Sequence, residues 1–303
     1  MFVNKNSERG KSIKKRNRRQ LIFEIVALLL AMIIFVFPFL HLFAVSISSS
    51  RAIMSGEVYL WPIEPQLSAW GTVFKNGDLL HSFVFTVLLT AVYTVFGLVL
   101  AILAAYPLSR KKLKGKNFFI TYFMITMYFG GGLIPTYLWI DQLKLIDTFW
   151  VLVLPGAFSV FNMLILKSFM QNIPESIEEA AKIDGASDMR VLMSIILPMS
   201  MPVLATLTLF FMISRWNGFS DAIFYIPTRS EYTPLQLLLQ RMLTVATDID
   251  FIRMKRGTMI SERILQESQK AANILFSLIP ILLIYPWLQK YFVKGVTLGS
   301  IKE

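Results

Sequence analysis

Residues 82–109 read SFVFTVLLTAVYTVFGLVLAILAAYPLS, a stretch without a single Asp, Glu, Lys or Arg. An α-helix needs about 20 mostly apolar residues to cross the roughly 30 Å hydrocarbon core of a bilayer, so this stretch is long enough to span it. In lipid no water satisfies the backbone N–H and C=O groups, and a helix satisfies them all within one segment. The stretch therefore predicts a membrane-spanning helix.

Five further blocks have the same character, and none contains Asp, Glu, Lys or Arg. They run over Ile25–Ser50, Asn117–Ile140, Thr148–Leu166, Val191–Ser214 and Ala271–Gln289. The composition agrees with them, because 55% of the residues are hydrophobic and only 16% are charged, whereas soluble domains carry about 25% charged residues. We predict an all-α integral membrane protein with six transmembrane helices.

The net charge of +11 is concentrated in two segments. The first is the N-terminal tail, with Lys5, Arg9, Lys11, Lys14, Lys15, Arg16, Arg18 and Arg19, and the second holds Arg110, Lys111, Lys112, Lys114 and Lys116. Lys and Arg in short loops mark the cytoplasmic side, so we predict that both termini are cytoplasmic. The tail then faces anionic lipid, and we expect no nucleic-acid partner.

A loop between the fourth and fifth predicted spans, residues 172–198, has the ends of a helix–turn–helix. Pro174 suits the first turn of a helix, and Glu175, Glu178 and Glu179 follow where negative charge is favoured. Gly185 suits a left-handed helix end, and Ser187 can cap a second helix. We predict a rigid projection on the cytoplasmic side.

One face of the first of these helices is small and mostly apolar. Its members are spaced i, i+3, i+4 and i+7, and they are Ile177, Ala180, Ala181 and Asp184. Small side chains permit close approach by another protein. A helix lying on the bilayer is the alternative, but it favours a basic polar face and bulky apolar anchors, and this helix is acidic and Ala-rich.

The spacing in this loop resembles the signature of bacterial ABC importer permeases. That signature is Glu-Ala-Ala, three residues, Gly, nine residues, Ile, one residue and Leu-Pro, and it is matched by Glu179–Ala181, Gly185, Ile195 and Leu197–Pro198. The resemblance implies a coupling helix that sits in a groove of an ATP-binding subunit. The ATPase-coupling residues it implies are Glu178, Glu179, Ala180, Ala181, Asp184 and Gly185.

Further stretches resemble the carbohydrate branch of these permeases, and in particular the subgroup that takes up oligosaccharides released from complex polysaccharides. They are Tyr128–Tyr137, Leu154–Ala157, Phe161–Asn162, Trp216–Asn217 and Tyr232–Gln236. The resemblance implies a multi-pass chain in a bacterial cytoplasmic membrane. It also implies a second, homologous permease subunit in a heterodimer, two ATP-binding subunits and an external solute-binding protein.

The chain is predicted to be a non-catalytic subunit. It lacks the Gly-x-x-x-x-Gly-Lys-Ser/Thr loop that cradles phosphates, so ATP and Mg²⁺ belong to the partner ATPases, and we expect no catalytic residue, cofactor or metal site. An ion-coupled secondary sugar transporter is the main alternative, and a receptor-like membrane protein is a third. Ion-coupled carriers place ionisable groups in mid-membrane, whereas here Glu24 and Arg215 lie at span ends.

Substrate contacts are expected from aromatic and polar residues, because sugar sites combine aromatic faces with a few polar groups. The candidates along the substrate pathway are Tyr128, Trp139, Asn162, Trp216, Asn217, Asp221 and Tyr225. Interfacial belts and hydrogen bonds between helices explain such residues equally well. External basic residues favour either an acidic oligosaccharide or docking of the binding protein; they are Arg229, Arg241, Arg253, Lys255 and Arg256.

The domain organisation follows from these assignments. We predict a basic cytoplasmic tail (1–20), a first transmembrane helix with an external loop (21–81), a permease core with five transmembrane helices (82–293) and a cytoplasmic C-terminal tail (294–303). The core contains the coupling loop (172–198) and an external segment (215–270). In that external segment, Pro234 starts a predicted short helix, and Ser261 with Glu262 predicts a cap before the last span.

Overall fold

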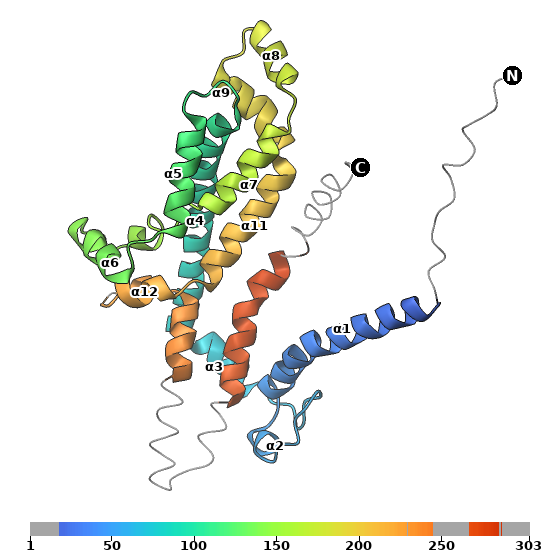
Figure 1. Ribbon diagram of the computed structural model, residues 1–303. Helices are drawn as coiled ribbons and strands as arrows, with labels where there is room; N and C mark the ends of the chain where they lie inside the picture. The colour runs from blue at the N-terminus through green and yellow to red at the C-terminus, as the bar shows by residue number, and fades with distance from the viewer. Residues whose placement is uncertain (1–17, 229, 245–266, 285, 287–303) are drawn as a thin grey trace, which may run out of the picture. The chain divides into compact units, whose positions relative to one another are not determined.

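The computed structural model describes residues 18–228, 230–244, 267–284 and 286 (Figure 1). The parts outside the described residues include most of the basic N-terminal tail, the expected cap at Ser261 and the C-terminal tail. They also include four of the external basic residues, Arg229, Arg253, Lys255 and Arg256. The chain divides into two compact units. The first combines Met1–Trp70 with Ile260–Ala272, the second combines Gly71–Met259 with Asn273–Glu303, and each is described by itself.

In the first unit, α1 (Arg18–Ser46) is apolar all round, and its most hydrophobic window has no buried residue. The helix ends four residues before the predicted Ser50, where the chain turns into the short α2 (Ser50–Met54). Ser49 caps α2 by accepting a hydrogen bond from the Ala52 amide at 3.2 Å. A helix that is hydrophobic all round is expected of a membrane span.

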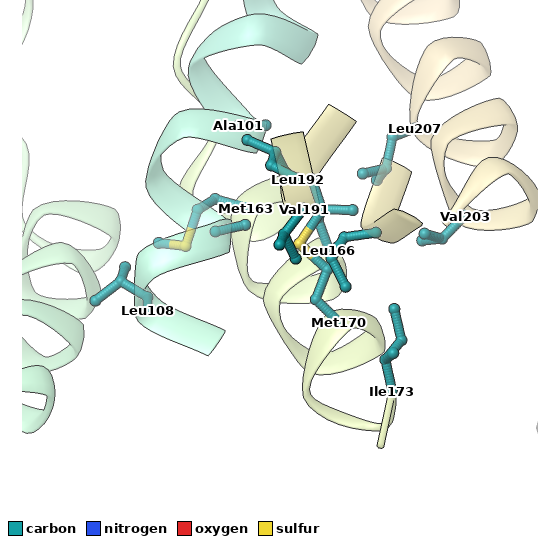
Figure 2. Close-up of a cluster of buried hydrophobic side chains, with 12 residues drawn as sticks. Ala101, Leu108, Met163, Leu166, Met170, Ile173, Val191, Leu192, Val203 and Leu207 are labelled. Carbon is teal, nitrogen blue, oxygen red and sulfur yellow. The ribbon is translucent and has the colours of Figure 1, made fainter. Parts of the chain in front are cut away.

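The second unit is built on α4 (Gly77–Ser109), α7 (Val160–Gln171) and α11 (Met201–Asn217), and α4 packs along both of the others (Figure 1). The Asn76 side chain caps α4 by accepting a hydrogen bond from the Leu79 amide at 3.1 Å. Figure 2 shows the core between the three helices, with Leu108 from α4, Leu166 from α7 and Leu207 from α11. This core fixes the end of the bundle that carries the coupling loop.

The third predicted span is not one continuous helix. It consists of α5 (Lys116–Tyr128) and α6 (Leu133–Gln142), which meet at an angle of 110°. The break lies at the glycine triplet 130–132. Gly132 has φ +86°, a backbone conformation that residues with a Cβ rarely adopt. The third predicted span is therefore interrupted and sharply bent at the triplet.

The fourth predicted span, Thr148–Leu166, is also broken. A short 3₁₀ turn, η1 (Phe149–Leu152), is followed by irregular chain, and α7 begins only at Val160 after a cap by Ser159. Pro155 explains the break, because proline lacks an N–H and disfavours helical backbone at the residue before it. The Tyr93 hydroxyl donates a hydrogen bond to the Gly156 carbonyl at 2.5 Å, which ties this irregular segment to α4.

The fifth predicted span changes direction as well. After α9 (Asp188–Val191) come the π-helical turn η2 (Leu192–Ile196) and α10 (Leu197–Met199), and the axis then bends by 81° into α11. Two prolines flank this bend, at positions 198 and 202. Proline removes a helical hydrogen bond and is among the usual causes of a sharp kink.

Among the described residues, three helices are long and apolar enough to cross a membrane, or up to five if each bent pair forms one span. The three are Leu21–Ser46, Gly77–Ser109 and Glu267–Ile284. The all-α class is confirmed over the described ranges, and the number of six spans stays a prediction. The short helix predicted near Pro234 covers residues 235–244, and its Leu235 amide donates to the Thr86 hydroxyl at 2.8 Å.

Candidate functional site

The coupling loop contains the predicted helix–turn–helix. Its first helix is α8 (Glu175–Ile183), and the turn that follows the helix has Gly185 at φ +80°. The Gly185 amide donates to the Lys182 carbonyl at 3.0 Å, and the Ala186 amide donates to the Ala181 carbonyl at 2.9 Å. These two bonds form a Schellman motif, which satisfies carbonyls at the end of a helix. The turn predicted at Gly185 is confirmed.

The turn leads directly into α9. Ser187 caps α9 by accepting a hydrogen bond from the Arg190 amide at 3.4 Å. Across the turn, the Lys182 ammonium lies 2.6 Å from the Asp188 carboxylate, and this hydrogen bond raises the pKa of Lys182 above its usual value. The bridge joins α8 to α9, so the two short helices project as one piece. Figure 1 shows them at one end of α4, α7 and α11, away from α6 and α12.

The predicted apolar face of α8 is divided between the core and the surface. Ile177 and Ala181 pack against the buried cluster of the bundle, whereas Ala180, Asp184 and Gly185 are exposed. The most exposed of the large apolar side chains in the loop is Ile183, which is 86% exposed. One side of α8 therefore packs on its own bundle, and the tip stays exposed for another protein.

Acidic residues of α8 face the basic segment that follows α4. Glu178 is buried and forms an ion pair with Arg110, whose side chain is 17% exposed. Lys111 lies 3.4 Å from Glu175, and Lys112 lies 3.8 Å from Glu179, and both of these pairs are exposed. Sequence reasoning took the basic segment as a marker of membrane orientation alone. The sequence signal that could have predicted these ion pairs is the run of three basic residues at 110–112 together with the acidic residues of α8.

Another ion pair, whose guanidinium is buried, lies at the other end of α11. Arg215 is buried, and its guanidinium contacts the two carboxylate oxygens of Asp221 at 2.5 and 3.0 Å. It also donates to the carbonyls of Leu152 at 3.1 Å and Gly218 at 2.9 Å. Arg215 thus joins η1, the end of α11 and the start of α12 (Ser220–Tyr225). We call this arrangement the Arg215 corner, and sequence reasoning missed it.

Three of the predicted substrate-contact residues have side-chain partners inside the chain, and a fourth is buried. The Asp221 carboxylate binds Arg215, and the buried Trp216 donates its indole N–H to the Ser277 carbonyl at 3.1 Å. Tyr225 is buried and stacks on Tyr137 with ring centroids 6.1 Å apart. Asn162 is buried in the first turn of α7. These contacts place all four residues in the internal packing of the second unit.

The other three candidates are exposed. Tyr128 lies at the end of α5, Trp139 lies on α6, and Asn217 ends α11. The side-chain amide nitrogen of Asn217 donates to the Ile213 carbonyl at 3.1 Å, which leaves the side-chain oxygen of Asn217 as an acceptor. Exposed aromatic faces together with a polar group are the chemistry that a sugar site needs. The structure does not bring all seven candidates together in one site.

A cavity of about 500 Å³ lies between α4, α11 and the described part of the last helix. Trp216 and Phe83 form part of its wall, and the other lining residues are apolar except Thr90 and Thr94. A sugar needs several convergent polar groups, so this cavity does not suit one. The described parts of the chain contain no cluster of three His, Cys, Asp or Glu side chains that could hold a metal ion.

Replacing Trp216 with phenylalanine is expected to weaken the fold and leave substrate affinity unchanged. The change removes the donor to Ser277 and opens a space beside Phe83, which costs about 1–3 kcal/mol. Thermal unfolding in detergent and the concentration dependence of uptake check this. The exposed Trp139→Ala variant is the comparison. A weakened substrate affinity in Trp216→Phe at unchanged stability would contradict the packing role.

An all-helical membrane chain with bent spans and a protruding helix–turn–helix is the architecture of a transporter permease. The chain belongs to the family of binding-protein-dependent transport system inner membrane components, whose model matches residues 82–298. The resemblance to ABC importer permeases inferred from residues 179–198 is thereby confirmed.

Several relatives share nearly the whole chain. It is 38% identical to the polygalacturonan/rhamnogalacturonan transport system permease protein YtcP of Bacillus subtilis, over 91% of this chain and 95% of the relative. It is 37% identical to protein LplC of the same organism, over 88% of this chain and 89% of LplC. Among solved structures it is similar to a chain of a bacterial ABC transporter involved in the import of the acidic polysaccharide alginate. That match has a TM-score of 0.77 and 33% identity, and it covers 91% of this chain and 98% of the other.

Proposed function

We propose that this chain is one of two permease subunits of an ABC importer that takes up oligosaccharides released from a polysaccharide. Uronic acid oligomers are the first candidates, since one relative is named for polygalacturonan and a similar structure comes from an alginate transporter. The exposed Tyr128, Trp139 and Asn217 supply aromatic faces and an amide along the pathway. The exposed Arg241, on the helix formed by residues 235–244, supplies positive charge.

The observation that carries this proposal is the geometry of the coupling loop. The loop is fixed to its own bundle by Ile177 and Ala181, while Ile183, Asp184 and Gly185 stay exposed at its tip. An exposed apolar side chain on a rigid projection suits docking into a groove of another protein. In the proposed assembly, an ATP-binding subunit receives this tip together with Glu179 and Ala180. ATP and Mg²⁺ are bound by that subunit, and this chain itself hydrolyses nothing.

Membrane orientation follows from the same proposal. The coupling loop and both termini face the cytoplasm, and α6, α12 and the Arg215 corner face outward, where a solute-binding protein delivers its load. The apolar surfaces of α1 and α5, exposed in the single chain, contact lipid and the second permease subunit. ATP-driven closure of the ATPase pair then shifts the tip, and the bundle alternates between inward-facing and outward-facing arrangements, since coupled transport requires two discrete states.

Uptake into proteoliposomes tests the proposed function. The chain is reconstituted with its second permease, the ATP-binding subunits and the binding protein, and labelled uronic acid oligomers are compared with neutral oligosaccharides. We expect uptake that needs ATP hydrolysis, persists when ionophores collapse ion gradients, and favours the acidic oligomers. Uptake that follows an ion gradient without ATP would contradict the proposal and support an ion-coupled carrier.

A further inference from the structure

The segment after α4 and the helix α8 are joined by three pairs of opposite charge that differ in burial. Lys111 and Lys112 are 81% and 89% exposed, so water and salt screen their pairs with Glu175 and Glu179. Arg110 and Glu178 are 17% and 9% exposed. A buried charge that loses its partner is strongly unfavourable, so this pair is far harder to separate than its two neighbours.

Arg110 directly follows the last turn of α4. Its backbone amide donates to the Pro107 carbonyl at 3.1 Å, and Arg110 forms the C-terminal cap of the helix. Its guanidinium lies over the Tyr106 ring, 4.8 Å from the ring centroid, which is a cation–π contact. The Tyr106 hydroxyl lies 3.5 Å from the Asp188 carbonyl oxygen at the start of α9. The end of α4 therefore contacts both short helices of the coupling loop.

The other end of this connection is also rigid. α4 packs along α7 and α11 and holds the Tyr93 contact to Gly156. Gly97 on the same helix approaches Phe211 so closely that there is no room for a Cβ. Close packing of this kind transmits displacement rather than absorbing it. A shift of α8 that carries Arg110 with it therefore moves α4 and the helices against it.

We propose that the Arg110–Glu178 ion pair is the link through which displacement of the coupling loop reaches the transmembrane helices. Arg110 and Glu178 are positioning residues, because neither is argued to touch solute or nucleotide. Glu178 is directed at its own chain, and the exposed tip of α8 carries the contact to the ATPase. This inference rests on the proposed function, and it makes a prediction about coupling that the function alone does not make.

The test measures solute imported per ATP hydrolysed in proteoliposomes that hold the full transporter. Glu178→Gln and Arg110→Met each remove one charge of the buried pair, and Lys111→Gln with Glu175→Gln removes the exposed pair as a matched control. We expect the two buried-site variants to keep hydrolysing ATP while this ratio falls on the order of fivefold or more, the lower end of typical coupling energies. The control is expected to change the ratio by about twofold or less.

A cross-linked variant tests the same link where a charge change prevents folding. The sequence contains no cysteine, so Arg110→Cys with Glu178→Cys can be joined by a bis-methanethiosulfonate reagent and released by a reductant. We expect the cross-linked protein to couple ATP to uptake and the reduced protein to lose that coupling.

Equal coupling in both states, or in Glu178→Gln and the native protein, would overturn the role of the ion pair. Failure of the native assembly to import with ATP would instead overturn the proposed function.

Discussion

Replacing Asp221 with asparagine is expected to destabilise the protein by about 3–5 kcal/mol, the cost of leaving a buried charge without its partner. Arg215 is 6% exposed, so its guanidinium cannot turn to water when the carboxylate is lost. The carbonyls of Leu152 and Gly218 remain as acceptors, but they carry no full charge. Thermal or denaturant unfolding in detergent checks the expected loss.

Replacing Arg215 with methionine is expected to destabilise the protein less than Asp221→Asn does. The double variant is expected to lose less stability than the sum of the two single losses. In Arg215→Met the Asp221 side chain, which is 32% exposed, still reaches water, and in the double variant neither charge remains. A double-mutant cycle measures this coupling directly. Equal costs for Asp221→Asn and Arg215→Met, or strict additivity, would contradict the buried ion pair. A loss of oligosaccharide affinity at native stability would return Asp221 to the substrate pathway.

Replacing Gly97 with valine is expected to prevent close packing of α4 on α11. A Cβ at this position would lie 2.7 Å from Cε1 of Phe211 and 3.0 Å from the Ala157 carbonyl oxygen. Phe211 cannot move aside easily, because it is 2% exposed and packs edge-on against Tyr93. Overpacking of a filled core costs about 1–3 kcal/mol. Valine adds two methyl groups beyond the Cβ, so we expect a loss of stability at the upper end of that range.

The control for Gly97 lies in the same helix. A Cβ at Gly77, the first residue of α4, meets nothing within 4 Å, so Gly77→Ala is expected to be neutral or slightly stabilising. Both variants are compared by the amount of folded protein in the membrane and by melting temperature in detergent. Gly97→Val with the melting temperature of the native protein would show that α4 and α11 do not approach as described.

Local structure in the coupling loop was predictable because single residues decide it. Gly185 is the residue that tolerates φ +80°, and Ser187 offers an oxygen to the next helix, so the turn and the cap follow from the sequence. The face of α8 was not predictable in the same way. Spacing groups Ile177 with Ala180, but which side of the helix meets the bundle is set by tertiary contacts such as Arg110 with Glu178.

The long apolar blocks identified the chain as a membrane protein, but they did not predict the path of the chain within each block. Block length says whether a helix can span, and this was enough for α1 and α4. It does not reveal the 110° bend between α5 and α6 or the 81° bend before α11. Glycine and proline mark where such breaks are possible, and their angles depend on packing. The Arg215 corner was missed for a related reason. Gly218 and Asp221 are close to Arg215 in sequence, but the Leu152 carbonyl comes from a segment 63 residues away.

The most direct test of the central claim concerns the tip of the coupling loop. Ile183 is 86% exposed, so Ile183→Gln should leave the melting temperature of the isolated chain unchanged. If an ATP-binding subunit buries this side chain, the lost burial corresponds to about 1.5–3 kcal/mol, or roughly tenfold or more in affinity.

The measurement is binding of the ATP-binding subunit together with ATP-dependent uptake, for the native protein and for Ile183→Gln in the same proteoliposomes. We expect both quantities to fall about tenfold in the variant at native stability. Native binding and native uptake in Ile183→Gln would contradict the claim that this tip couples the permease to its ATPase.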